Sequence, residues 1–385
     1  MILSVVIVSY NVKFFLEQCL CSLKKAVEGS PLTNGRTEVF IVDNASSDGS
    51  LEFLIPLFPS FHFIRNNENK GFAKANNQAA FQCSGEYILF LNPDTIVAED
   101  SLELCLSFFK SHPDAGATGL HMIDGGGNYL KESKRGFPSP RASFFKVSGL
   151  ARIFPRSKFF SGYYIGYLHE DSTHAVDVLS GAFMMIKKTV FDTTGGFDEQ
   201  FFMYAEDIDL SFRIRQAGYQ NFYLSNTTII HFKGESTKKD FRYVKIFHDA
   251  MELFMKKHFS VSMSSFQRYF LTAGVRLSRT ISYLQSAFKK SNVLPLNPGV
   301  VFIKGEPAEK EKWKQRCMSL GISVSDNEND AQEIIYCESS LRSWKSIITE
   351  IINNKKRYRY IFSGAGTHAA VGSYSSRGRG EVFEI

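Results

Sequence analysis

The stretch "LSVVIVSYN", Leu3 to Asn11, decides the fold class of this chain. Its apolar residues follow one another without the alternation of a strand that has one wet face. A run of this kind is typical of a parallel strand whose two faces are both covered by helices. We therefore expect a central strand here, with Ser9, Tyr10 and Asn11 at its carboxyl end.

Strands and helices alternate through the first half of the chain. An amphipathic helix is expected from about Phe14 to Val27. The segments after it are, in order, strand "EVFIVDN", helix "SLEFLIPLF", strand "FHFIRN", helix "KANNQAAFQC" and strand "YILFLNPD". This order predicts an α/β domain built on an open parallel sheet with right-handed crossovers.

Polar residues gather where these strands end. Ligands of open α/β sheets bind beyond the carboxyl ends of the strands. The sequence therefore predicts a binding site in the N-terminal half. Its candidate residues are Ser9, Tyr10 and Asn11; Asp43 and Asn44; Asn66 and Asn67; and Asn92 and Asp94.

The composition limits the class of protein. A length of 385 residues favours two domains, and 44% hydrophobic with 14% aromatic residues supports a folded core rather than disorder. The net charge, 45 basic minus 39 acidic side chains or +6, is too small to indicate nucleic-acid binding. The six cysteines form no CxxC pair and no zinc-like spacing with histidine, which favours buried free thiols.

The N-terminus reads as a buried strand rather than an export signal. It lacks the basic region and cleavage site of a signal peptide, and no run in the sequence reaches the roughly 18 apolar residues of a spanning helix. We expect a cytoplasmic protein, either free or peripheral on the cytoplasmic face of the membrane.

Two later segments differ in composition from the strand-helix pattern. Residues 124–173 are rich in Gly, Pro, Ser and basic residues and are expected to form a long loop over the site, as active-site lids do. Strand "VDVLSGAFMMIKK" follows. Residues 241–290 show a helical pattern, with Arg268, Arg276, Arg279, Lys289 and Lys290 among aromatic residues. This segment either lies on an anionic membrane surface or docks on its own protein or a partner subunit.

The remainder, 291–385, begins with the linker-like "NVLPLNPG" and continues as a second, small α/β unit of unknown role. Its glycine-rich end lacks the lysine-serine pair of a P-loop. The expected domains are thus 1–240, 241–290 and 291–385.

An acidic run, "GGFDEQFFMYAEDIDLSFRIRQAGY" from Gly195 to Tyr219, mixes carboxylates with aromatic residues. Carboxylates among aromatics shift their pKa or find a partner, and one held in a cleft is a candidate general base. The alternative is a surface helix with acids in its first turn and arginine later. This stretch alone supports both interpretations equally.

Three further motifs place chemistry at the strand ends. In "VDNASSDGS", Asp43 is positioned to accept from a base N–H or a ribose hydroxyl. In "NENKGFAKANNQA", Gly71 permits close approach of the backbone to a ligand, and Asn76 lies on the next helix. In "FLNPDT", Asp94 supplies one of the carboxylates that Mg²⁺ or Mn²⁺ takes together with phosphate oxygens.

Seven motifs in one order produce a resemblance over residues 1 to about 235. They are "VSYN", "VDNASSDGS", "NKGFAKANN", "LNPDT", "SGAF", "GGFDEQFFMYAEDIDLSFR" and "IIHFKGES". The chain resembles the inverting family 2 glycosyltransferases of the GT-A fold, in particular the rhamnosyltransferases of bacterial surface polysaccharide synthesis. The α/β class expected from the residues becomes, by this resemblance, a GT-A domain with a helical extension and a small C-terminal α/β domain.

The resemblance implies a role for each matching residue. Asp207 is the general base, and a divalent metal, Mg²⁺ or Mn²⁺, is held by Asp94 at the last position of the DxD motif and by His231. Asn92 stands where many members have aspartate. The donor nucleotide is bound by Ser9, Tyr10, Asn11, Asp43, Asn44, Gly71, Asn76 and Asn92. The acceptor side includes Gly181, Ala182, Glu206 and Arg213, although an ion pair with Asp209 also accounts for Arg213.

The implied reaction is transfer of a single sugar, rhamnose for preference, with inversion. The donor is a dTDP- or UDP-sugar, and the acceptor is a saccharide or a lipid-linked saccharide. A non-catalytic sugar-nucleotide-binding or assembly protein of the same fold is the alternative, and the presence of both Asp94 and Asp207 argues against it. A processive synthase is disfavoured because the sequence has no spanning helix and no QxxRW motif. No nucleic-acid partner is expected.

Overall fold

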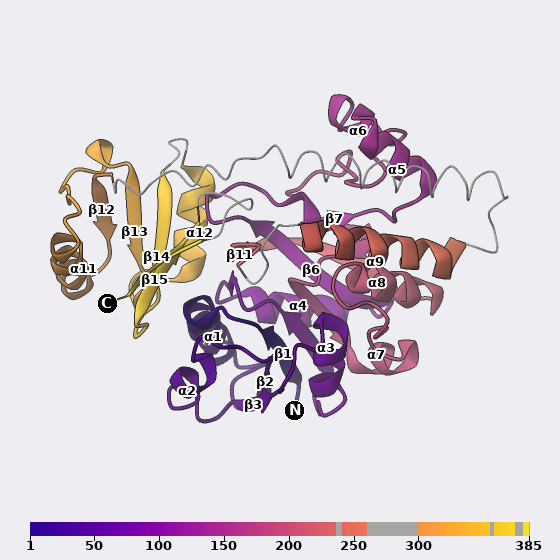
Figure 1. The fold of residues 1–385 in the computed structure, drawn as a ribbon, viewed down its shortest axis with the longest axis horizontal. Coiled ribbons are helices and arrows are strands. Elements are labelled where there is room, and N and C mark those ends of the chain that lie inside the picture. The colour runs from indigo at the N-terminus through magenta and orange to yellow at the C-terminus, as the bar shows by residue number, and fades with distance from the viewer. Residues whose placement is uncertain (236–240, 260–298, 355–357, 374–379, 385) are drawn as a thin grey trace.

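A mixed sheet of nine strands forms the centre of the molecule (Figure 1). The computed structural model describes residues 1–235, 241–259, 299–354, 358–373 and 380–384. The strand order is β3-β2-β1-β4-β10-β6-β11-β5, with β8 paired to β11. The strands are β1 (Leu3–Ser9), β2 (Thr37–Asp43), β3 (His62–Arg65), β4 (Tyr87–Leu91), β5 (Thr95–Ile96), β6 (Ala115–Ile123), β8 (His174–Val176), β10 (Phe183–Lys187) and β11 (Gln220–His231).

Helices cover both faces of this sheet, as the apolar run of β1 predicts. Leu3, Val5 and Ile7 pack toward α1 (Lys13–Glu28), α2 (Ser50–Leu54) and α4 (Ser101–Ser111). Val6 and Val8 pack on the other face, toward α3 (Phe72–Ala80), α7 (Lys188–Thr194) and α8 (Glu206–Gln216). The six cysteines are free thiols and five of them are buried, as expected.

The strands of the first half pair as the sequence predicts, and the second half differs. β1 is parallel to both β2 and β4, and β2 is parallel to β3. β10 instead runs antiparallel to both β4 and β6. The expected strand "VDVLSGAFMMIKK" is divided into β8, β9 (Val178–Leu179) and β10 by a bend at Asp177 and a turn at Gly181 and Ala182. The Ala182 carbonyl accepts from the Asn92 N–H at 3.0 Å.

Two local elements also differ from expectation. Helix α2 ends at Leu54, short of the expected "SLEFLIPLF", because Pro56 has no N–H with which to continue the hydrogen bonds of the helix. The expected long loop over the site contains the short elements η1 (Lys131–Ser133), β7 (Lys134–Arg135), α5 (Pro140–Val147) and α6 (Leu150–Ile153), and β7 pairs with β9.

Helix α9 (Phe241–Phe259) packs its apolar face against the region around α8. Phe254 and Met255 are buried in a cluster with Phe201 and Ile208 of the α8 region. The sequence left open whether this segment lies on a membrane surface or docks on protein. For α9 the structure shows docking on the same chain. The basic residues Arg268, Arg276, Arg279, Lys289 and Lys290 lie outside the described residues, as do the expected boundaries at 240 and 290. Among the described helices, none is both long and apolar enough to cross a bilayer.

The C-terminal residues form a second sheet, as expected from their alternating pattern. Its order is β12-β13-β14-β15-β16, with the first three strands parallel. Its elements are β12 (Val301–Lys304), α11 (Pro307–Ser319), η2 (Glu328–Asp330), β13 (Glu333–Cys337), α12 (Trp344–Asn353), β14 (Arg359–Ser363), β15 (Ala369–Gly372) and β16 (Glu381–Glu384). We call residues 299–385 the C-terminal unit.

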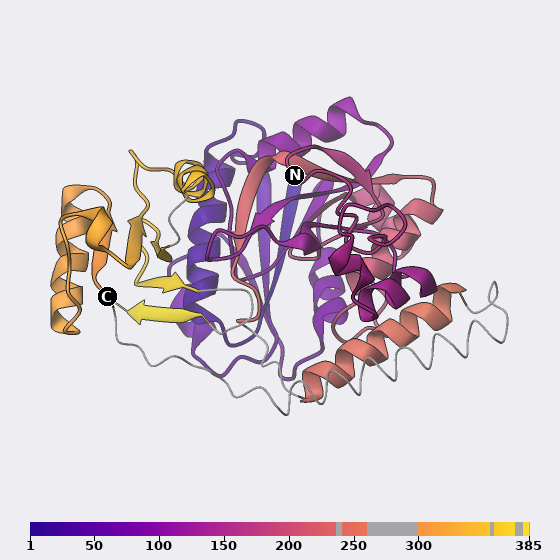
Figure 2. The ribbon, with the colours of Figure 1, turned by 90° about the horizontal axis from the view of Figure 1, so that it is seen from above.

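The C-terminal unit is docked beside α1 through a shared apolar core (Figure 2). Trp344 and Phe362 belong to one buried cluster with Phe15 of α1 and Phe232, which follows β11. Buried Gln18 donates to the Ala369 carbonyl at 2.6 Å and accepts from the Gly364 N–H at 2.9 Å. The two sheets therefore share both apolar and polar contacts.

A second polar contact joins the C-terminal unit to the loop after β11. Both carboxylate oxygens of buried Glu235 accept from the Gly380 N–H, at 2.8 and 2.7 Å. Position 380 has no room for a side chain, since a Cβ there would lie 2.5 Å from Phe15 Cζ and 2.8 Å from Glu235 Oε1.

The docked arrangement makes a prediction about unfolding. Gln18→Ala leaves the Gly364 N–H without its partner and takes one of two side-chain donors from the Ala369 carbonyl, which keeps the Thr367 hydroxyl. A buried group left without a partner costs about 1–3 kcal/mol. Both tryptophans, Trp313 and Trp344, lie in the C-terminal unit, so their fluorescence reports on that unit while far-UV circular dichroism reports on the whole chain.

In the wild type the two signals should change at the same denaturant concentration. In Gln18→Ala the fluorescence transition should move to a lower concentration. Gln82→Ala, at an exposed glutamine, is the matched control. A Gln18→Ala variant that unfolds like the control would contradict the stabilising role of this contact.

Candidate active site

A cavity of about 270 Å³ opens beyond the carboxyl ends of β1 and β4. From the first half of the chain, the candidate residues Tyr10, Asn44, Gly71, Asn92 and Asp94 line it. From the second half, Gly181, Ala182, Glu206, Asp207 and His231 line it. The structure thus brings ten of the sequence-predicted residues to one place, at the edge of the sheet where they were expected.

Asp94 and His231 meet because their strands pair. Thr95 of β5 is the register partner of His231 in β11, and the Phe232 N–H donates to the Asp94 carbonyl at 3.0 Å. His231 Nε2 lies 3.3 Å from Asp94 Oδ1 and 3.3 Å from Asn92 Nδ2, and it can donate to the first or accept from the second. Burial alone would raise the pKa of Asp94, but His231 and the Glu235 backbone N–H hold it below its ordinary value.

Asp207 is held by a buried arginine that the sequence did not single out. Asp207 Oδ2 accepts from Arg135 Nη2 at 2.5 Å and from the Gly181 N–H at 3.2 Å, and Oδ1 accepts from the Ile208 N–H at 2.8 Å. The same Arg135 Nη2 donates to the Leu179 carbonyl at 2.9 Å. Burial lowers the pKa of Arg135, but Asp207 and Tyr163 outweigh it and raise that pKa, so Arg135 is charged at neutral pH.

Glu206, the neighbour of Asp207, has no charged partner in the part of the chain that the structure describes, and its pKa is raised. Its side chain lines the cavity and is buried, and its Oε2 has no hydrogen-bond partner among the described residues. Burial, followed by the negative charge of Asp207, raises the pKa of Glu206 to about 8. At neutral pH Glu206 is therefore a neutral acid that can donate a hydrogen bond into the cavity.

Backbone strain aims these two carboxyls. Tyr204 and Ala205 have left-handed φ values of 71° and 65° just before α8 begins at Glu206. Such conformations cost about 1 kcal/mol or more for residues with a Cβ and persist where surrounding contacts enforce them. Here they turn the start of α8 so that Glu206 and Asp207 both line the cavity.

Ser9 and Asp43 lie beneath the cavity rather than at its wall. They are register partners on β1 and β2, and both are buried. Asp43 Oδ2 accepts from the Ser46 N–H at 3.0 Å, while Asp43 Oδ1 and Ser9 Oγ have no hydrogen-bond partner among the described residues. Unsatisfied buried polar atoms at a strand end are consistent with a ligand that supplies the missing partners.

The polar atoms of three other candidates are already engaged by the chain. Asn44 donates to Asn69 and to the Gly71 carbonyl, and its Oδ1 accepts from Asn66 and the Lys70 N–H. Asn11 Oδ1 accepts from Ser47, and Asn76 donates to the Phe72 carbonyl. These side chains shape the loops around the cavity.

Gly71 is required by the chain itself, whatever ligand approaches it. Its φ is 82°, and a Cβ there would lie 2.5 Å from the Phe202 carbonyl oxygen. The close approach expected at Gly71 is thus made by the segment that leads into α8, which ties the two halves of the cavity wall together.

Known proteins resemble this chain over the region that carries the site. The model described as glycosyl transferase family 2 matches residues 4–195. An N-acetylglucosaminyl-diphospho-decaprenol L-rhamnosyltransferase from Mycobacterium tuberculosis is 31% identical over 251 residues, which cover 62% of this chain and 78% of that protein. The chain belongs to glycosyl transferase family 2.

Other similar proteins include a poly-beta-1,6-N-acetyl-D-glucosamine synthase from Staphylococcus aureus, 28% identical over 48% of this chain and 40% of that protein. A solved mannosyltransferase from Pyrobaculum calidifontis, in complex with GDP-Man and Mn²⁺, has a TM-score of 0.47 at 16% identity, covering 74% of this chain and 72% of that chain. The family, the enzyme class and the GT-A fold class expected from the sequence are confirmed.

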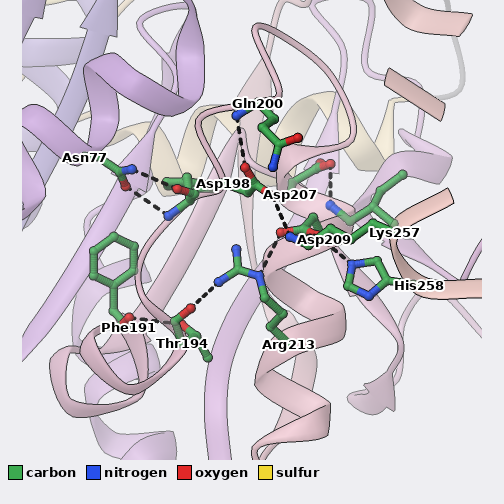
Figure 3. Close-up of polar contacts among 12 residues, drawn as sticks. Asn77, Phe191, Thr194, Asp198, Gln200, Asp207, Asp209, Arg213, Lys257 and His258 are labelled. Atoms are coloured by element: carbon green, nitrogen blue, oxygen red, sulfur yellow. Dashed lines mark hydrogen bonds and ion pairs between the residues drawn. The ribbon is translucent and has the colours of Figure 1, made fainter. Parts of the chain in front are cut away.

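Arg213 of this glycosyltransferase lies away from the cavity. It pairs through Nε with Asp209 Oδ2 at 2.7 Å, the alternative that the sequence left open. Figure 3 shows Asp209 between Arg213 of its own helix and Lys257 and His258 of α9, which lie 2.8 and 2.6 Å from Oδ1. Fully buried Asp209 thereby fastens α9 to α8, a structural role.

Lys233 and Glu132 complete the charged wall of the glycosyltransferase cavity. The two side chains form an ion pair. Lys233 stands inside the quoted motif "IIHFKGES", so a basic residue beside His231 was visible in the sequence. Arg135 and Glu132 stand in a segment without helix or strand periodicity. No sequence signal indicates that Arg135 faces Asp207 or that Glu132 faces Lys233.

The raised pKa of Glu206 predicts a pH dependence of stability. The folded state binds this proton more tightly than the unfolded state, so the free energy of unfolding decreases as the pH rises from the ordinary pKa of 4.5 to about 8. Each unit of pKa difference corresponds to about 1.4 kcal/mol. Glu206→Gln stays neutral and should lose this decrease.

Denaturant unfolding measured between about pH 5 and about pH 9 checks the prediction. The difference in the free energy of unfolding between Glu206→Gln and the wild type should grow in favour of the variant by at least about 1 kcal/mol from the lower to the higher pH. Glu28→Gln, at an exposed glutamate, should follow the wild type. Parallel curves for Glu206→Gln and the wild type would show that Glu206 is ionised in the folded protein.

Proposed function

We propose that this glycosyltransferase moves a single sugar, rhamnose as the first candidate, from a nucleotide-diphosphate donor to a saccharide or lipid-linked saccharide acceptor, with inversion. The observation that carries the proposal is the placement of Asp207 and the Asp94–His231 pair at one cavity. The mycobacterial relative is named as an L-rhamnosyltransferase of a decaprenol-linked acceptor. We extend that sugar and acceptor class to this chain, together with action at the cytoplasmic face of the membrane in cell-surface polysaccharide synthesis.

The donor nucleotide is assigned to the edge formed by β1 and β2. Asp43 Oδ1 and Ser9 Oγ offer an acceptor and a donor without partners among the described residues, as a base N–H and a carbonyl or ribose hydroxyl require. Tyr10 lines the adjoining wall. We assign the dTDP- or UDP-sugar to this edge of the sheet.

The residues at the end of β4 fit a divalent metal. Asp94 provides a carboxylate and His231 an imidazole, and no third His, Cys, Asp or Glu joins them in a cluster within the described part of the chain. Mg²⁺ and Mn²⁺ commonly take few protein ligands and complete their shell with phosphate oxygens and water. When bound, such an ion stabilises negative charge on the departing diphosphate.

Asp207 is the proposed general base. It takes the proton of the acceptor hydroxyl while that oxygen bonds to the anomeric carbon and the bond to the nucleoside diphosphate breaks. Oδ2 is occupied by Arg135 and Gly181, so we assign the proton to Oδ1, whose recorded donor is the Ile208 N–H. Arg135 positions the carboxylate, and neutral Glu206 is placed to donate a hydrogen bond to the acceptor.

The base assignment predicts that Asp207→Asn abolishes transfer. The amide has nearly the same shape but cannot accept the proton, and loss of a general base costs roughly 10²–10⁴-fold in rate. Binding of the donor should remain nearly unchanged, as measured by calorimetry with a panel of dTDP- and UDP-sugars that also identifies the preferred nucleotide.

Asp192→Asn, at an exposed aspartate, should transfer at the wild-type rate. A wild-type rate in Asp207→Asn would refute the assignment. If the wild type binds a sugar nucleotide but transfers it to no acceptor, the non-catalytic alternative gains support.

The metal assignment makes a separate prediction. Chelation should stop transfer, and Mn²⁺ should restore it. Asp94→Asn removes a charged ligand and should raise the Mn²⁺ concentration needed for half-maximal rate by at least about tenfold. Asp100→Asn is the matched control, because Asp100 accepts a hydrogen bond from Thr227 and pairs with Lys345 away from the cavity. It should leave the Mn²⁺ dependence unchanged. Full activity in the presence of chelator would remove the metal from the proposal.

A further inference from the structure

Residues 137–162, here named the basic aromatic segment, carry charge of one sign. They contain Arg141, Lys146, Arg152, Arg156 and Lys158 and no Asp or Glu. Four of these basic residues, Arg141, Arg152, Arg156 and Lys158, are exposed. A chain with a net charge of only +6 thus concentrates five positive charges in 26 consecutive residues.

The same segment exposes large apolar side chains. The exposed fractions are 60% for Phe144, 67% for Ile153, 48% for Phe154 and 54% for Phe159. Single exposed apolar residues are ordinary, but a group of them on one short segment marks an interaction site.

Ring contacts join these side chains into one patch. Phe145 contacts Phe144 and Phe159, with centroids 5.6 and 5.3 Å apart, and Phe160 contacts Phe154 at 5.2 Å and Phe159 at 5.0 Å. The Arg141 guanidinium lies over the Phe159 ring at 4.6 Å. Apolar and basic groups therefore share one surface, and Figure 1 shows α5 and α6 projecting from the body of the molecule.

The two ends of the segment are fastened beside the active site. The Gly136 N–H donates to the Tyr163 carbonyl at 2.8 Å, and a Cβ at position 136 would clash with the Gly162 carbonyl oxygen. Arg135, the residue before this closure, holds Asp207. Whatever binds the patch is thereby brought near the mouth of the cavity.

We propose that the basic aromatic segment docks the enzyme on an anionic lipid bilayer. Exposed Phe and Ile side chains gain free energy on entering the interface, and Arg and Lys are attracted to acidic headgroups. Ile153 favours a bilayer over nucleic acid, since an aliphatic side chain has no base-stacking role. Two copies of the patch would repel each other through their like charges, which disfavours self-association. This inference concerns a surface outside the cavity and does not depend on the proposed reaction.

Flotation of the purified full-length protein with phosphatidylcholine vesicles, with and without phosphatidylglycerol, tests the proposal. The wild type should float with the phosphatidylglycerol vesicles, and added salt should weaken the binding. The variant Arg152→Glu/Arg156→Glu/Lys158→Glu should bind at least about tenfold more weakly. Ile153→Ser/Phe159→Ser should also bind more weakly, with its remaining binding still sensitive to salt.

Control variants make the same kinds of change, charge reversal or apolar to serine, elsewhere on the surface. Arg36→Glu/Lys110→Glu and Met318→Ser/Leu341→Ser should float like the wild type. Thermal unfolding and sugar-nucleotide binding, unchanged in every variant, show that the fold is retained.

Three outcomes would overturn the proposal. The first is a wild type that does not bind the vesicles, or binds them equally without phosphatidylglycerol. The second is that charge reversal of Arg268, Arg276 and Arg279 abolishes vesicle binding, whereas charge reversal of the basic aromatic segment does not. The third is a change of oligomeric state in the patch variants, measured by light scattering, with vesicle binding intact, which would make the patch an interface between copies.

Discussion

Backbone pairing between distant strands is the constraint on which the active site depends. β11 lies between β6 and β5, and the β5 pairing places His231 beside Asp94. β10, inserted antiparallel between β4 and β6, brings the Gly181–Ala182 turn to Asn92. Main-chain hydrogen bonds of the sheet thus position Asn92, Asp94 and His231.

The sequence predicts what is local and misses what is set by distant pairing. β1 to β4 and the α/β character of the C-terminal unit follow from apolar runs of strand length, although β15 was not predicted. Tyr10, Asn44, Asn92 and Asp94 follow from their places after strands. The direction of β10 was not predictable, because it is decided by its neighbours in the sheet. Arg135 was missed because its partner Asp207 lies 72 residues away and its own segment has no periodicity.

The first turn of α8 separates three acidic residues by their surroundings. Asp207 is paired with Arg135, burial raises the pKa of Glu206, and Asp209 is surrounded by the basic groups of Arg213, Lys257 and His258. Acidic residues in one turn therefore have different surroundings and different roles. All three lie beyond residue 195, where the match to the family model ends.

Contacts of Glu235 connect the C-terminal unit to the metal side of the cavity. Its carboxylate accepts from Gly380 and its own N–H donates to Asp94. The crowded position of Gly380 fixes where the last strand begins, so a bulky fusion attached after Ile385 would pull on a strand two hydrogen bonds from Asp94. Met1, exposed at the opposite end of β1 from the cavity, is the better attachment point for an affinity tag or a fluorescent label.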